Sequence, residues 1–114
     1  MSPSKASSRK RTHHVYVIEL APEVWKHGKY RAANPNRSAV KPCLYVGMTG
    51  LTPEIRFDRH RYGVKDNTYA RRYGVRLRPD LYAGLNPLPR AEAVRMERVL
   101  AQELRNDGYG VWQK

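Results

Sequence analysis

The sequence has little cysteine, few acidic residues and no long apolar run. Cys43 is the one cysteine among 114 residues, which excludes an internal disulfide and a cysteine-rich zinc site. No stretch approaches the ~18 consecutive apolar residues that a transmembrane helix needs, so we expect no membrane span. The first residues are basic and lack the apolar core of a signal peptide. We therefore expect a cytoplasmic protein.

Positive charge is in large excess. Lysine and arginine total 22 against 10 acidic residues, which gives a net charge of +12 at pH 7. A small chain of this kind usually binds a polyanion, most often nucleic acid. The alternatives are a basic surface that serves solubility or one that binds a membrane surface. The length predicts one domain with a modest core, which we place at residues 13–114 after a disordered basic tail at residues 1–12.

Three short segments have strand-like patterns. Residues 15–20 and 43–46 are rich in β-branched and aromatic side chains, and residues 75–78 alternate apolar and basic ones. Residues 21–42 are interrupted by prolines, so we expect a long loop with one helical turn at residues 23–27.

This loop carries aromatic and basic side chains. Trp25 and Tyr30 either stack on nucleobases or hold the loop against the core. Several basic residues here and further along the chain are expected to contact nucleic acid. They are Lys41, Arg59, Arg61, Arg71 and Arg72.

The clearest helix start follows the second strand. Gly47 ends the strand, Thr52 is a typical N-cap and Pro53 suits the first helical position. We expect this helix to extend to about Tyr62 and to end at Gly63.

Chemically useful side chains come together around this helix. Arg56 and His60 are four residues apart and therefore share one face. Tyr45 lies on the strand just before the helix. A tyrosine, an arginine and a histidine beside a glycine turn are suited to holding a phosphodiester.

Residues 89–106 predict the longest helix, between Pro89 and Gly108. Glu97 lies at the edge of its apolar stripe, half turned toward the core, where a carboxylate needs a partner. That partner is either an arginine such as Arg56 or a divalent metal ion, because oxygen ligands suit magnesium or manganese. The apolar stripe itself consists of Ala93, Met96, Leu100 and Leu104.

Taken together, these motifs resemble the GIY-YIG endonucleases over residues 15 to about 104. Tyr45-Val46-Gly47 matches the second half-motif, and Val15-Tyr16 is similar to the end of the first. The Met-Thr-Gly turn that follows, and then Arg56 and His60, have the spacing of the family's first helix. Glu97 matches the family's glutamate in a later helix.

The resemblance implies an α/β (α+β) fold and metal-dependent hydrolysis of nucleic acid. The fold would be a small three-stranded, mainly antiparallel sheet flanked by helices, in the order β-β-α-β-α. The substrate would be DNA in preference to RNA.

The same resemblance assigns roles to the site residues. Glu97 would hold one divalent cation, Mg²⁺ or Mn²⁺, and Arg56 would bind the scissile phosphate. Tyr16 and Tyr45 would line the site, one of them helping to activate or orient the attacking water, with His60 as general base.

The chain departs from the family pattern at several positions. His14 replaces a glycine, and the loop between Tyr16 and Tyr45 is longer than usual. The asparagine that often closes the family's site has no clear counterpart, although Asn106 and Gln113 lie near the end of the chain.

Two alternatives to an enzyme therefore stay open. One is a catalytically inactive, basic nucleic-acid-binding module on the same fold. The other is a basic subunit of a larger nucleoprotein assembly. A carboxylate beside a bound phosphate favours the enzyme, because it repels the phosphate unless a cation lies between them.

Overall fold

The computed structural model describes residues 10–63 and 67–113. Most of the predicted tail, residues 1–9, lies outside these ranges, and residues 10–12 have no regular secondary structure. The elements in chain order are β1 (His14–Leu20), η1 (Pro22–Lys26), α2 (Gly28–Ala32), β2 (Cys43–Thr49), α3 (Pro53–Arg61), α4 (Thr68–Tyr73), β3 (Gly74–Leu77), η2 (Pro79–Leu81), α5 (Arg90–Asn106) and β4 (Gly110–Gln113).

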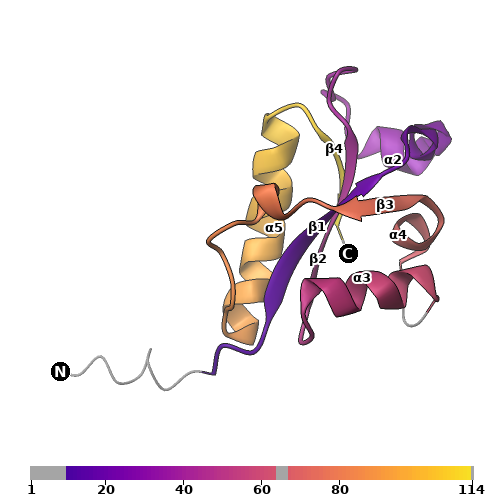
Figure 1. Ribbon diagram of the computed structural model, residues 1–114. Helices are drawn as coiled ribbons and strands as arrows, with labels where there is room; N and C mark the ends of the chain where they lie inside the picture. Colours follow the sequence, from indigo (N-terminus) through magenta and orange to yellow (C-terminus); the bar gives the residue numbers. More distant parts are fainter. Residues whose placement is uncertain (1–9, 64–66, 114) are drawn as a thin grey trace.

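The four strands form one mixed sheet in the order β3-β1-β2-β4 (Figure 1). β1 is antiparallel to both β2 and β3, and β4 is parallel to β2. The predicted α+β class is confirmed. The prediction of three strands was wrong, because residues 110–113 add a fourth strand at the edge of the sheet. The predicted third strand is present, shifted by one residue to Gly74–Leu77.

The helices cover the two faces of the sheet separately. Strand register places Tyr16, Tyr45 and Trp112 on one face, because paired residues share a face and successive residues alternate. This face carries α3 and α4, whereas α5 covers the other (Figure 1). None of the helices in the described ranges combines the length and apolar character needed to span a membrane.

The long helix α5 buries a stripe that includes a charged residue. Ala93, Leu100 and Leu104 are buried as predicted, whereas Met96 is only partly buried. Glu97 is 7% exposed and lies within the stripe, not at its edge as predicted. A carboxylate at this depth needs a specific partner, because burial disfavours its charge.

The predicted loop at residues 21–42 contains η1 and α2 and is fixed to the sheet by Tyr30. Tyr30 is fully buried, and its hydroxyl donates to the carbonyl oxygen of Leu44 at 2.8 Å and accepts from the Leu44 amide at 3.0 Å. Trp25 packs edge-on against Tyr30, with ring centroids 6.1 Å apart. Tyr30 therefore holds the loop against the core and is not available to stack on a base.

Asn34 connects the same loop to the edge strand. Its Oδ1 accepts hydrogen bonds from the Val111 amide at 2.7 Å and from Nε of Arg105 at 3.3 Å. Its Nδ2 donates to the carbonyl oxygen of Tyr30 at 2.8 Å. The side chain of Asn34 thus links the loop, α5 and β4, and it contributes to the docking of β4 beside β2.

The role of Asn34 predicts the effect of its removal. We expect Asn34→Ala to lower the free energy of unfolding by about 1–3 kcal/mol, because the buried Val111 amide loses its acceptor. Urea denaturation followed by circular dichroism measures this change. Asn36→Ala, at an exposed position in the same loop, is the matched control. Equal stability of the two variants would contradict this role.

Candidate active site

Helix α3 begins and ends as the sequence predicts. The hydroxyl of Thr52 accepts a hydrogen bond from the Ile55 amide at 3.2 Å, and Pro53 occupies the first helical position. Gly63 follows the helix end with a φ of 77°, a conformation that glycine adopts without a steric penalty. These local signals fix where α3 starts and therefore which of its residues face the sheet.

The side chain that α3 inserts most deeply is His60, which is fully buried. Its Nε2 lies 2.8 Å from the hydroxyl oxygen of Tyr16, in a buried hydrogen bond between α3 and β1. The ring of Tyr45 lies beside both, with centroids 5.6 Å from His60 and 6.3 Å from Tyr16. The structure therefore brings together three of the five predicted catalytic residues.

Gly47 makes room for this cluster. A Cβ atom at this position would lie 2.6 Å from the hydroxyl oxygen of Tyr16 and 3.0 Å from Cε2 of Tyr45. Both distances are too short for a carbon atom, so any side chain here would displace the tyrosines. The prediction that Gly47 ends the strand was wrong, because β2 continues to Thr49; the glycine is instead required for this close approach.

Arg56 and Glu97 complete the set, as their effects on the tyrosines show. Burial is the main reason that the pKa of Tyr45 rises to about 12, and the Glu97 carboxylate adds to the rise. The Arg56 guanidinium opposes it. Burial also raises the pKa of Tyr16, as does Tyr45, and Arg56 again lowers it. Arg56 therefore acts electrostatically on both phenols and Glu97 acts on Tyr45, and both phenols are neutral at neutral pH.

Gln113 is a neighbour of the site that the sequence did not assign. Its Nε2 lies 3.4 Å from Oε1 of Glu97, a long hydrogen bond. Asn106, the other residue considered for this role, accepts instead from Gln102 Nε2 at 2.9 Å, more than two turns from Glu97 along α5. Gln113 reaches Glu97 only because β4 joins the sheet, and no local sequence pattern indicates this.

The predicted nucleic-acid contacts fall into two groups. Arg59 and Arg61 lie exposed on α3, and Arg71 and Arg72 lie exposed on α4. Lys41 lies apart, two residues before β2, with its ammonium group 4.6 Å from the ring centroid of Tyr109. Four of the five basic residues therefore belong to the helices that cover the tyrosine face of the sheet.

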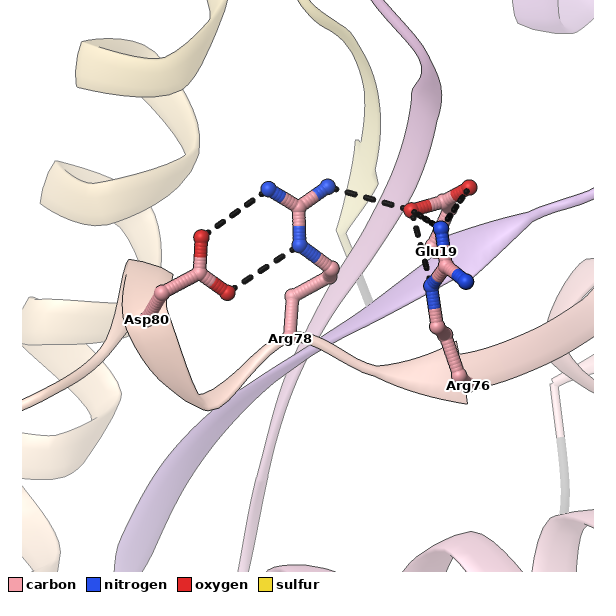
Figure 2. A network of polar contacts seen from close by, with 4 residues as sticks. All are labelled: Glu19, Arg76, Arg78 and Asp80. Carbon is pink, nitrogen blue, oxygen red and sulfur yellow. Dashed lines mark hydrogen bonds and ion pairs between the residues drawn. The ribbon is translucent and has the colours of Figure 1, made fainter.

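Two further arginines are engaged with carboxylates (Figure 2). Glu19 accepts from Arg76 and Arg78, each at 3.1 Å, and Arg78 also bonds Asp80 at 2.9 Å. The hydrogen bond to Asp80 is the main reason that the pKa of Arg78 is raised. These charges largely cancel one another, so this network adds little net charge to the basic surface.

Glu97 suits a metal ion that takes few ligands from the protein. In the described ranges, no three histidine, cysteine, aspartate or glutamate side chains cluster closely enough to hold a metal ion. Mg²⁺ often takes one or two protein carboxylates and completes its shell with water and phosphate oxygens. Glu97 could therefore be the single protein ligand of a magnesium-type ion shared with a bound phosphate.

No protein-family model, curated protein or solved structure matches the chain. The resemblance to the GIY-YIG endonucleases therefore depends on the residues of this site and on their arrangement.

The contacts of Gly47 predict a substitution effect. We expect Gly47→Ala to lower the free energy of unfolding by about 1–3 kcal/mol, because the new methyl group overlaps Tyr16. Thermal or urea unfolding measures the loss. Gly50→Ala is the control, because a Cβ atom there would lie 3.5 Å from its nearest neighbour, Nε2 of His13. A Gly47→Ala variant as stable as the control would contradict the packing described.

The raised pKa of Tyr45 predicts a loss of stability in alkali. The phenol ionises near 10 when unfolded and near 12 when folded. Its contribution is therefore complete below pH 10 and is lost as the pH rises from 10 to 12. By about pH 11 the loss amounts to ~1.4 kcal/mol. Urea unfolding between pH 9 and pH 11 should show a shallower decline for Tyr45→Phe than for the wild type; identical slopes would contradict this.

Proposed function

We propose that the chain is a GIY-YIG-type endonuclease that hydrolyses phosphodiester bonds in nucleic acid, DNA in preference to RNA. The observation that carries the proposal is the buried Tyr16–His60 hydrogen bond, with Tyr45 packed against both rings. Arg56 acts electrostatically on both tyrosines, and Glu97 acts on Tyr45. These five residues come from β1, β2, α3 and α5, which are distant in sequence, and they supply every chemical type that the reaction needs.

Glu97 and Arg56 offset the negative charge of the substrate, Glu97 through a bound cation and Arg56 directly. Glu97 would hold a Mg²⁺ or Mn²⁺ ion, which when bound stabilises charge on the phosphate and on the leaving oxygen. The Arg56 guanidinium offers planar, permanently charged donors to the phosphate oxygens. A buried carboxylate beside a phosphate site favours an enzyme over a simple binding module, because without a cation the two negative groups repel each other.

Tyr16 and His60 remove the proton from the attacking water. The raised pKa of Tyr16 disfavours a phenolate as the base. His60 Nε2 is held by the Tyr16 hydroxyl, so in our proposal the proton passes through that hydroxyl. Tyr16 takes a proton from water while giving its own to Nε2. The resulting hydroxide oxygen bonds to phosphorus as the bond to the leaving oxygen breaks.

The proposal is tested by cleavage of labelled plasmid and single-stranded DNA with Mg²⁺ or Mn²⁺. We expect the wild type to cut and Glu97→Gln, which keeps the volume of the buried side chain, to lose about 100-fold or more of the rate. DNA binding by the variant should stay within about 2-fold of the wild type, because the substitution removes a negative charge and no basic group. Glu103→Gln, at an exposed position on the same helix, is the control.

The other outcomes have clear meanings. A wild-type protein that binds DNA and never cuts it with either metal would overturn the enzyme in favour of the inactive binding module. Cleavage that persists in Glu97→Gln would mean that the site is placed wrongly.

A further inference from the structure

A cavity lies on the tyrosine face of the sheet, beside the proposed active site. It has a volume of about 380 Å³, within the range of ~300–1,000 Å³ typical of small-ligand pockets. Its walls come from α2, α4, β4 and the residues that precede α2 and α4. They are formed by His27, Lys29, Asn67, Thr68, Tyr69 and Trp112.

The walls of this cavity are largely aromatic. The rings of Tyr69 and Trp112 meet edge to face, with centroids 5.1 Å apart at 83°. His27 lies 5.5 Å from Tyr69, and its Nε2 is fixed by a 2.7 Å hydrogen bond to the hydroxyl of Tyr73. Tyr69 and Trp112 are only partly buried, so part of each ring faces the cavity. Rigid aromatic walls of this kind suit a planar ring that stacks on them.

The register of the sheet connects the cavity to the proposed site. Trp112 is the β4 partner of Tyr45, and paired residues point to the same face. Neighbouring strands lie ~4.8 Å apart, so the cavity begins one strand away from Tyr45. A nucleotide whose phosphate lies at the tyrosine cluster can therefore place its own base, or that of the next nucleotide, against Trp112.

Charge around the cavity favours a polyanion. Lys29 lines it, and Arg71 and Arg72 lie exposed on α4, the helix that carries Tyr69. Among the residues that the structure describes, no aspartate or glutamate lines the cavity. A nucleic acid satisfies both features, because its phosphates match the basic residues and its bases match the aromatic walls.

We propose that this cavity binds an unpaired nucleobase next to the tyrosine cluster, so that the preferred substrate is single-stranded nucleic acid or a site with an unpaired base. The inference rests on the proposed function and specifies its substrate. A base in a duplex must first leave its stack, which carries a free-energy cost that an unpaired base avoids. Asn67 Oδ1 already accepts from the amides of Tyr69 and Ala70, so we expect little discrimination among bases.

Fluorescence of 2-aminopurine, which falls when the base stacks on an aromatic ring, tests this directly. The probe is a short single-stranded oligothymidylate that carries 2-aminopurine at one position, with EDTA present so that no divalent metal supports cleavage. We expect quenching on saturation with the wild-type protein for at least one probe position. The matching duplex should bind at least 5-fold more weakly. Adding the protein to this duplex should cause no further quenching.

Variants connect the signal to the cavity. Tyr69→Leu keeps apolar packing and removes one aromatic wall, so we expect it to weaken single-strand binding about 5-fold or more and to reduce the quenching. Tyr62→Ala, at a tyrosine that is 83% exposed and outside the cavity, is the control. Circular dichroism verifies that both variants fold. If Tyr69→Leu does not fold, the quenching and the single-strand preference of the wild type decide the question.

The fluorescence result tests the base-binding site whether or not the protein cleaves DNA. Single-strand binding without quenching at any position, or equal affinity for the duplex, would overturn the proposal and leave the cavity to a different ligand. Quenching that Tyr69→Leu reduces would support it, even if the protein never cleaves DNA. In that case the nuclease proposal fails and the base-binding site stands.

Discussion

The arrangement of the candidate site depends on one buried hydrogen bond, between the hydroxyl of Tyr16 and Nε2 of His60 at 2.8 Å. It ties α3 to β1, and it can form only because Gly47 leaves space for the tyrosine ring. The same bond fixes the histidine beside Tyr45. A polar pair at this depth is costly unless both partners are satisfied, so it serves as a specific constraint on how helix and sheet meet. In the proposed reaction it also becomes the path of the proton.

The two sides of the sheet differ in the charged side chains that they carry. The α5 side buries Glu97 within an apolar stripe, and the α3–α4 side carries arginines over the tyrosine face. A separate network of ion pairs joins two arginines to two carboxylates, so its charges add little net charge to the basic surface (Figure 2). Its members are Glu19, Arg76, Arg78 and Asp80. In our proposal the net positive charge attracts nucleic acid, and the buried carboxylate is what favours an enzyme over a binding module.

The sequence predicted those parts of the fold that have local causes. Thr52 and Pro53 determine where α3 begins, and the helical spacing of Arg56 and His60 places them on one face. The sequence could not predict β4, because a segment of four residues is too short to show a strand pattern. The position of β4 also depends on the hydrogen bond between Val111 and Asn34, which are 77 residues apart in the chain. The approach of Gln113 to Glu97 and the aromatic cavity both follow from that strand, and its Trp112 also stacks on Tyr30. These features therefore became visible only in three dimensions.

The central claim is that Tyr16 and His60 act as one unit in cleavage, and a double-mutant cycle tests it most directly. The cleavage rates of wild type, Tyr16→Phe, His60→Ala and the double variant are measured on one labelled DNA with Mg²⁺, after each variant is shown to fold. Our account predicts that the wild type cuts, that each single variant is slower, and that the double variant is no slower than the slower single. Losses that multiply in the double variant, or a wild type that does not cut, would contradict it.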